Sequence, residues 1–156
     1  MCDVRVPVVN SPLVSQDQVN GWYALLLAYD AVAAQVDEVL KERHRLSFSA
    51  VEILCQLNES EPQAVRSLAS HLISVSPTRA SRLVQELIDA GHLERSADQH
   101  DGRVSLISLT TSGRHFAKAV EQSLIEAVKI YFLDKLDDDD IAALSRVWAK
   151  LEKNGG

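Results

Sequence analysis

The sequence predicts a mainly α-helical protein with a small two-stranded β ribbon. Apolar residues recur at three- and four-residue spacing along most of the chain, which is typical of helices with one buried face. One stretch after the midpoint differs: two short runs of strand-forming residues flank an Asp-Gly pair, as in a hairpin. The length of 156 residues suits a single domain, residues 1–156, with a core of its own.

The N-terminal third predicts an arm followed by a long helix. Residues 1–15 contain two prolines and no period, so we expect an extended arm. Residues 16–43 carry apolar side chains at helical spacing, Trp22 among them, and their stripe is wider than packing on one small lobe requires. A partner subunit accounts for this excess, and a larger intrachain core is the alternative.

Two shorter helices follow a break at residues 44–47. Ser49 is a suitable cap for a helix over residues 50–59, and Pro62 opens the next unit. A helix over residues 64–73 and a turn at residues 73–75 then complete the first half of a helix-turn-helix.

The next helix has clear signals at both ends. Ser76 can cap its first turn and Pro77 fits its first position, while Gly91 is placed to end it. One face is apolar, with Ala80, Leu83, Val84, Leu87 and Ile88. The opposite face is polar, with Thr78, Arg79, Arg82 and Gln85.

A ribbon after this helix completes a winged helix-turn-helix lobe over residues 49–110. Residues 93–96 and 104–109 are the expected strands, and residues 98–103 form the hairpin tip around Asp101-Gly102. A helix with an arginine-bearing face fits the major groove of DNA, and the ribbon can reach the adjacent minor groove.

The C-terminal quarter predicts two more helices. Thr110 or Thr111 caps the first, which extends to about residue 133. Four aspartates, residues 137–140, precede the second. They lack the glycine and the later glutamate of an EF-hand calcium loop, so we interpret Asp137 as a cap and the other acids as partners of the helix dipole.

Charge distribution favours a nucleic-acid partner more than the net charge of −6 suggests. Residues 64–118 hold seven Lys and Arg against five Asp and Glu, whereas both flanking segments are acidic. No apolar run is long enough to span a membrane and no secretory signal opens the chain, so we expect a cytoplasmic protein. Of the two cysteines, Cys55 is expected to be buried and inert, and Cys2 lies in the arm.

The residues that catalysis requires do not gather into a known motif. The sequence has no G-x-S-x-G, H-E-x-x-H, C-x-x-C or phosphate-binding glycine loop, and its five histidines are scattered. We therefore expect no enzymatic activity, no cofactor and no metal site. A zinc site assembled across a dimer stays open as an alternative.

Double-stranded DNA is the expected partner of the helix-turn-helix face. Arginine can bind guanine through two hydrogen bonds, and Asp101 can hold the Arg103 guanidinium in a fixed orientation at the wing tip. The alternative is a solvated helix face on a module that docks another protein. The expected DNA-binding residues are Ser76, Pro77, Thr78, Arg79, Ser81, Arg82, Asp101 and Arg103.

The same residues resemble the MarR family of transcriptional regulators. The similarity covers residues 75–84, Gly91 to Arg95, the Asp101-Gly102-Arg103 wing and the L-T-x-x-G segment that begins at Leu109. It implies a homodimer whose terminal helices, residues 16–43 and 114–153, intertwine, and which binds a pseudo-palindromic site, with repression as the expected mode.

The resemblance also implies an effector, phenolic or otherwise small, bound between the dimer helices and the DNA-binding lobe. Candidate lining residues are Trp22, His44, Phe48 and His115, although each also suits a core or hinge position. Some relatives sense oxidants through a cysteine near the start of the first helix. This chain has none there, so a redox-responsive variant is a minor alternative, as is a metal-responsive one.

Overall fold

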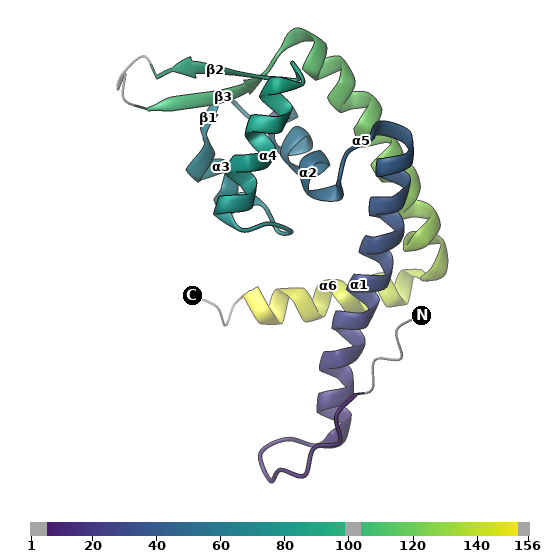
Figure 1. The fold of residues 1–156 in the computed structure, drawn as a ribbon. Coiled ribbons are helices and arrows are strands. Elements are labelled where there is room, and N and C mark those ends of the chain that lie inside the picture. Colours follow the sequence, from purple (N-terminus) through teal and green to yellow (C-terminus); the bar gives the residue numbers. More distant parts are fainter. Residues whose placement is uncertain (1–5, 99–103, 153–156) are drawn as a thin grey trace.

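A lobe of short helices and a small sheet lies at one end of the molecule, and two long helices run side by side away from it (Figure 1). The computed structural model describes residues 6–98 and 104–152. The elements in chain order are α1 (Gln16–His44), α2 (Phe48–Asn58), β1 (Gln63–Ala64), α3 (Val65–His71), α4 (Pro77–Asp89), β2 (Leu93–Ala97), β3 (Ser105–Leu109), α5 (Thr111–Tyr131), the 3₁₀ turn η1 (Leu133–Lys135) and α6 (Asp138–Glu152). The predicted fold class is confirmed, mainly helical with a small sheet.

The sheet has three antiparallel strands, whereas the sequence predicted two. β3 lies in the middle, between β2 and the additional strand β1. Gln63 and Ala64 of β1 pair with Ile107 and Leu106 of β3. A strand of two residues shows no alternation of apolar and polar positions, so periodicity could not detect it. As a result, the helix expected from residue 64 begins at Val65.

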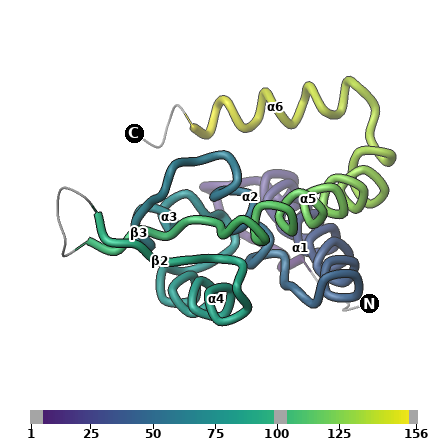
Figure 2. The backbone as a smooth tube through the Cα atoms, turned by 90° about the horizontal axis from the view of Figure 1, so that it is seen from above, coloured from purple at the N-terminus to yellow at the C-terminus, as the bar shows by residue number. Residues whose placement is uncertain are grey.

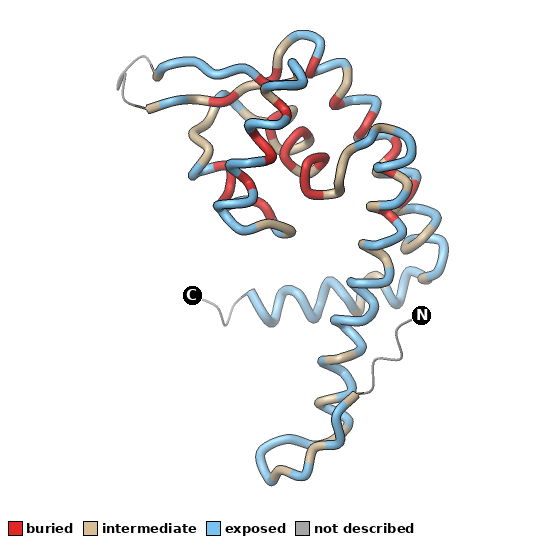
Figure 3. The backbone as a smooth tube through the Cα atoms, viewed as in Figure 1, coloured by how far each residue is buried: buried red, intermediate tan, exposed pale blue. Residues whose placement is uncertain are grey.

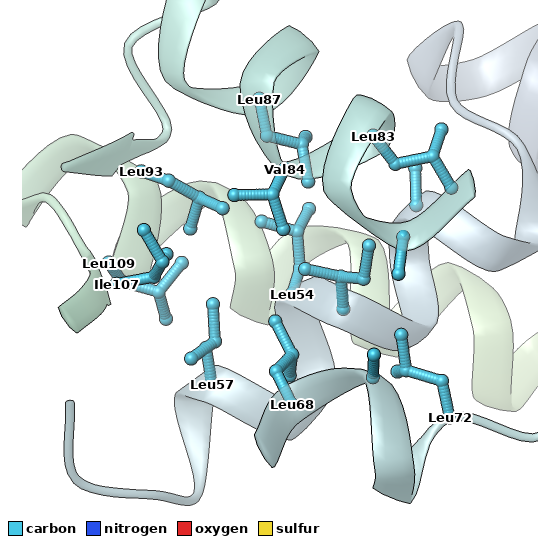
Figure 4. Packing of buried hydrophobic residues seen from close by; sticks show 14 of the residues in the cluster. Leu54, Leu57, Leu68, Leu72, Leu83, Val84, Leu87, Leu93, Ile107 and Leu109 are labelled. Atoms are coloured by element: carbon cyan, nitrogen blue, oxygen red, sulfur yellow. The ribbon is translucent and has the colours of Figure 1, made fainter. Parts of the chain in front are cut away.

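The lobe closes around its own apolar core, in which side chains from α2, α3 and α4 meet those of the sheet (Figure 4). Leu54 of α2, Leu68 of α3 and Ile107 of β3 are fully buried there. The stripe predicted for α4 faces this core, with Ala80, Leu83, Val84 and Leu87 all buried. The buried stripe fixes which face of α4 is left outside.

Most of the predicted helix ends are confirmed. Ser76 caps α4, Thr110 caps α5, and Gly91 follows α4 with a left-handed φ of 76°. Asp137 accepts a hydrogen bond of 2.9 Å from the N–H of Asp140, as expected of a cap on α6.

The cap predicted for α2 is wrong. Ser47 caps this helix instead of Ser49, and its hydroxyl accepts from the N–H of Ala50. Ser49 is buried inside the first turn, where its hydroxyl lies 2.9 Å from that of Ser74. Both serines satisfy the cap preference, so only the tertiary contact separates them.

A close contact joins the start of the wing to the start of α5. The N–H of Thr110 donates to the carbonyl of His92 over 3.0 Å, and the Thr110 hydroxyl donates to the carbonyl of Gly91 over 2.8 Å. Gly113 lies so near that a Cβ there would be 1.9 Å from the His92 carbonyl oxygen. The spacing of Thr110 and Gly113 in the L-T-x-x-G segment therefore has a physical reason: one residue caps α5 and the other makes room for the wing backbone.

The long helices are buried only where they pass the lobe. Val36 and Leu40 of α1 meet Val120 and Ala127 of α5 in a second, smaller core. Beyond it α1 projects away from the lobe (Figure 1), and α6 runs apart from the other helices (Figure 2). Every residue of α6 is at least partly exposed, as the pale blue tube in Figure 3 shows. Within the described residues, no helix combines the length and apolarity needed to cross a bilayer.

Candidate nucleic-acid interface

Helix α4 presents a polar face that points away from the lobe core. An α-helix turns by about 100° per residue, so with Ala80, Val84 and Leu87 buried, Thr78 and Arg82 lie nearly opposite the buried stripe. Both side chains are exposed. A long cationic side chain and a short hydroxyl on one outward face can donate to base edges or phosphates.

The first turn of α4 is prepared for a negatively charged partner. The Ser76 hydroxyl accepts from the N–H of Arg79 over 3.4 Å, and Pro77 occupies the first helical position. Helix N-termini attract phosphate because their N–H groups and the helix dipole point toward it. The Ser81 hydroxyl donates to the carbonyl of Pro77 over 3.1 Å, so in this structure it is engaged by the helix itself.

Arg79 lies at the edge of the outward face, on the side toward α1. It lines an open hollow of about 260 Å³ with mixed polar and apolar walls, together with Asp37 of α1, Ser49 of α2 and Ser74 of the turn. Burial alone would raise the pKa of Asp37. The hydrogen bonds from Lys41 and the Phe48 N–H, with the charges of Lys41 and Arg79, more than offset this and bring the pKa below its ordinary value. Arg79 is thus electrostatically coupled to the long helix α1.

Two further polar residues lie on the same surface and were not among the predicted site residues. Gln85 follows Arg82 on the outward face, and its amide donates to Asp89 over 2.8 Å. Arg95 of β2 donates to the side-chain Oε1 of Gln85 over 3.3 Å, so a cation from the wing lies against α4. Gln85 could have been included from its helical position. The Arg95 contact could not, because it depends on how β2 packs against the helix.

The wing is described up to the base of its tip. Ala97 and Ser105 form the last residue pair of β2 and β3, and the N–H of Asp98 donates to the carbonyl of Val104 over 2.9 Å. This closure agrees with a hairpin between residues 98 and 104. Asp101 and Arg103, predicted to contact DNA at the tip, lie outside the described residues.

The four residues predicted to line an effector pocket do not share one cavity. Phe48, the first residue of α2, lines an apolar cavity of about 320 Å³. Trp22 lies at a separate hollow beside the N-terminal arm. His44 is hydrogen-bonded to the Ser123 hydroxyl at 2.8 Å, and His115 is exposed on α5. The remaining lining residues of the apolar cavity are Leu25, Ala28, Tyr29, Val32, Ala33 and Val36 of α1, Val128 of α5, Phe132, and Leu144 of α6.

The groups that would make a metal or redox centre are dispersed or unreactive. In residues 6–98 and 104–152, no three His, Cys, Asp or Glu side chains come close enough to hold a metal ion. Cys55 is half-buried, where the sequence predicted full burial. Burial, and then the charges of Glu121, Glu59 and Glu52, raise the pKa of its thiol to about 11, in agreement with the predicted inertness.

Comparison with known proteins agrees with this geometry. Residues 46–105, which span α2 to the start of β3, match the model of the MarR family. A search of curated protein sequences found no match.

Solved structures, among them two MarR family regulators, share the fold. Sco3205, a MarR family transcriptional regulator from Streptomyces coelicolor solved in complex with DNA, is 18% identical with a TM-score of 0.83, covering 93% of this chain and 91% of its own. AbsC, a MarR family transcriptional regulator from the same organism, is 20% identical with a TM-score of 0.81, covering 92% and 97%. BpsR from Bordetella bronchiseptica, whose DNA binding is regulated by 6-hydroxynicotinic acid, is 18% identical with a TM-score of 0.76, covering 91% and 98%.

Proposed function

We propose that this chain is a DNA-binding transcriptional regulator of the MarR family and not an enzyme, and that it represses transcription by binding a pseudo-palindromic operator as a homodimer. The observation that carries the proposal is the outward face of α4, where Thr78 and Arg82 stand opposite the buried stripe beside a capped helix N-terminus. In this arrangement α4 enters the major groove and the wing reaches the minor groove. We expect such a regulator to act in the cytoplasm.

The contacts at the two grooves have different roles in the proposal. Thr78, Arg79 and Arg82 contact base edges or the flanking phosphates, and Ser76, Pro77 and Ser81 belong to the helix start that faces the backbone. Arg103, oriented by Asp101, enters the minor groove, whose negative potential attracts arginine and which carries little base information.

The homodimer is supported by apolar side chains that the chain leaves uncovered. Trp22 on α1 and Trp148 on α6 are exposed by 59% and 64%, and Leu144, Val147 and Leu151 form one stripe with Trp148. Exposed apolar surface on this scale is typical of a subunit interface. In the proposal, residues 16–43 and 114–153 are the N- and C-terminal dimerisation segments. A second copy of the chain packed on them would cover this apolar surface.

A small-molecule effector is supported by the cavity at the junction of the long helices and the lobe. Its lining is almost wholly apolar, with Tyr29 the one side chain that carries a hydroxyl, and α1, α2, α5 and α6 all contribute to it. An aromatic or other largely apolar molecule fits such a lining. Because Phe48 begins α2, an occupant that moves Phe48 also moves the lobe relative to α1.

Selection of DNA by the purified full chain tests the proposal. The protein is mixed with a random duplex library, bound fragments are sequenced, and the selected fragment is titrated at several salt concentrations. We expect a two-fold symmetric motif, two chains per duplex, and an affinity that falls steeply with salt. The reverse result, binding of all fragments alike or of none, would favour the protein-docking alternative.

A reporter gene distinguishes repression from activation. The selected operator is placed between a promoter and the reporter, and expression is measured with and without the protein. We expect expression to fall when the protein is present and to recover when an effector is added. A rise in expression would leave the DNA-binding proposal intact and overturn repression.

A further inference from the structure

One carboxylate holds the turn that precedes the recognition helix α4. Glu52 of α2 accepts a hydrogen bond from the N–H of Ile73 over 2.5 Å and from the N–H of Ser74 over 3.3 Å. It also accepts from the Ser74 hydroxyl over 2.5 Å. Three donors of two consecutive residues therefore converge on a single side chain 21 residues earlier in the chain.

Apart from Glu52, the turn has one other side-chain hydrogen bond at this point, the 2.9 Å contact between the hydroxyls of Ser74 and Ser49. The Ile73 side chain is 88% exposed, so burial contributes almost nothing to holding it. Leu72 before it is buried, and Val75 after it packs against the lobe core. The hydrogen bond with which Ser76 caps α4 is long, at 3.4 Å. The polar contact with Glu52 is thus the main restraint on the backbone between the two anchored residues.

Glu52 itself stands on a firmly held helix. Its neighbours Val51, Ile53 and Leu54 are fully buried, Val51 in the second core and the other two in the lobe core. The N–H of Phe48 at the start of α2 donates to Asp37 of α1 over 2.8 Å. Through α2 the carboxylate connects the turn of the helix-turn-helix with the long helix.

We propose that Glu52 is a positioning residue for DNA sequence recognition: it fixes the turn at Ile73 and Ser74, and thereby the depth and angle at which α4 presents Thr78 and Arg82. The proposal rests on the proposed DNA-binding function. Base contacts tolerate small errors of position poorly, whereas contacts to phosphates through flexible side chains tolerate them well. Loss of the carboxylate therefore affects discrimination between sequences more than binding as such.

The first test compares Glu52→Ala, Glu52→Gln and Glu59→Ala in the full chain. Glu59 is exposed at the end of the same helix, so its loss removes the same charge without touching the turn. The probes are the duplex that the wild-type protein selects from a random library and a scrambled duplex of equal composition. We expect Glu52→Ala to lower the ratio of the two affinities about ten-fold, Glu52→Gln to lower it less, and Glu59→Ala to leave it unchanged.

Affinity for the scrambled duplex separates the effect of a displaced α4 from the effect of one lost negative charge. Both alanine variants lose one negative charge, so we expect an equal, small gain on this duplex. An unchanged ratio in Glu52→Ala would overturn the positioning role. If the wild-type protein itself selects no sequence, the proposed function fails, and this role in recognition fails with it.

Amide hydrogen exchange tests the contact without DNA. In Glu52→Ala the N–H groups of Ile73 and Ser74 lose their acceptor, so we expect their exchange to accelerate at least ten-fold while the amides of α4 from Ala80 onward keep their protection. Thermal unfolding of each variant is recorded alongside. Faster exchange throughout the lobe, or no change at Ile73 and Ser74, would contradict the proposal.

Discussion

The lobe and the two helical ends of this chain, which are α6 and the part of α1 beyond the lobe, differ in how far they bury their apolar residues. In the lobe, Leu54 is fully buried by side chains that all come from the same chain. On α6, Trp148 is 64% exposed although it belongs to an equally regular apolar stripe. Regular periodicity predicts a buried face in both places, but it does not say whether the covering partner is the same chain or another one.

This difference divides the molecule by the kind of stability that each part is expected to have. Folding of the lobe core is unimolecular, so its contribution does not depend on protein concentration. In the proposed dimer, the stability of α6 and of the projecting part of α1 is expected to come from association and so to depend on protein concentration. The following variants separate the two contributions, from the largest expected effect to the smallest.

Leu54→Ala tests the lobe core, which a single chain buries on its own. Removal of a fully buried leucine leaves a cavity, and we expect the free energy of unfolding to fall by about 2–5 kcal/mol. Chemical denaturation at two protein concentrations measures it, and the loss should be the same at both. A loss of less than 1 kcal/mol would mean that the lobe repacks around the gap.

Trp148→Asp tests the exposed apolar stripe of α6. A charge in a seam that the partner desolvates should weaken association by about 2–4 kcal/mol, which sedimentation equilibrium measures as a shift toward monomer. Ala149→Asp is the matched control, because it places the same charge about 100° around α6 from Trp148, on the side away from Leu144 and Leu151. If both variants remain dimeric, or if both dissociate, the apolar stripe of α6 is not the dimer interface.

Arg79→Ala and Arg82→Ala test the surface of the lobe and leave its core intact. Each is expected to relax discrimination at a half-site position by about 1–3 kcal/mol, measured by titration of single-base operator variants. Arg114→Ala removes an exposed cation from the first turn of α5 and serves as control. Equal weakening on every sequence by Arg79→Ala would reassign that residue to a phosphate.

Cys55 lies at the border of the two regions, where α2 packs against the second core. Because its thiol pKa is raised to about 11, the reactive thiolate is scarce at neutral pH and grows about ten-fold per pH unit below 11. In a Cys2→Ser background we expect iodoacetamide labelling to be slow at pH 7 and to accelerate in this way. DNA binding that is lost at neutral pH on mild peroxide treatment would instead favour the redox-responsive alternative.

The sequence was sufficient to predict the features that depend on neighbours a few residues apart. The caps Ser76, Thr110 and Asp137 and the buried stripe of α4 belong to this class, because side chains within one turn determine them. The two runs of strand-forming residues on either side of the Asp-Gly pair likewise located the two longer strands.

Apart from Gln85, which its helical position already indicated, the features that escaped prediction depend on contacts between distant segments. Strand β1 forms because Gln63 meets Ile107, and Ser49 lies inside α2 because its hydroxyl meets Ser74. The tie between Glu52 and the turn is of the same kind. From the sequence of α2 alone, Glu52 is expected to be an ordinary solvent-exposed acid. Only the packing of α2 against the turn makes its carboxylate a hydrogen-bond acceptor for Ile73 and Ser74.

The close contact between Gly113 and His92 couples the orientation of α5 to that of the wing base. The wing backbone is held against the first turn of α5 at Thr110 and Gly113, so the base of the wing and this helix turn together. With 21 residues α5 spans about 31 Å, so a tilt of about 5° displaces its far end by roughly 3 Å relative to its base. That far end contributes Val128 to the apolar cavity. Because α5 is one continuous helix, we expect a displacement of a few ångströms there to change the angle at the base of the wing.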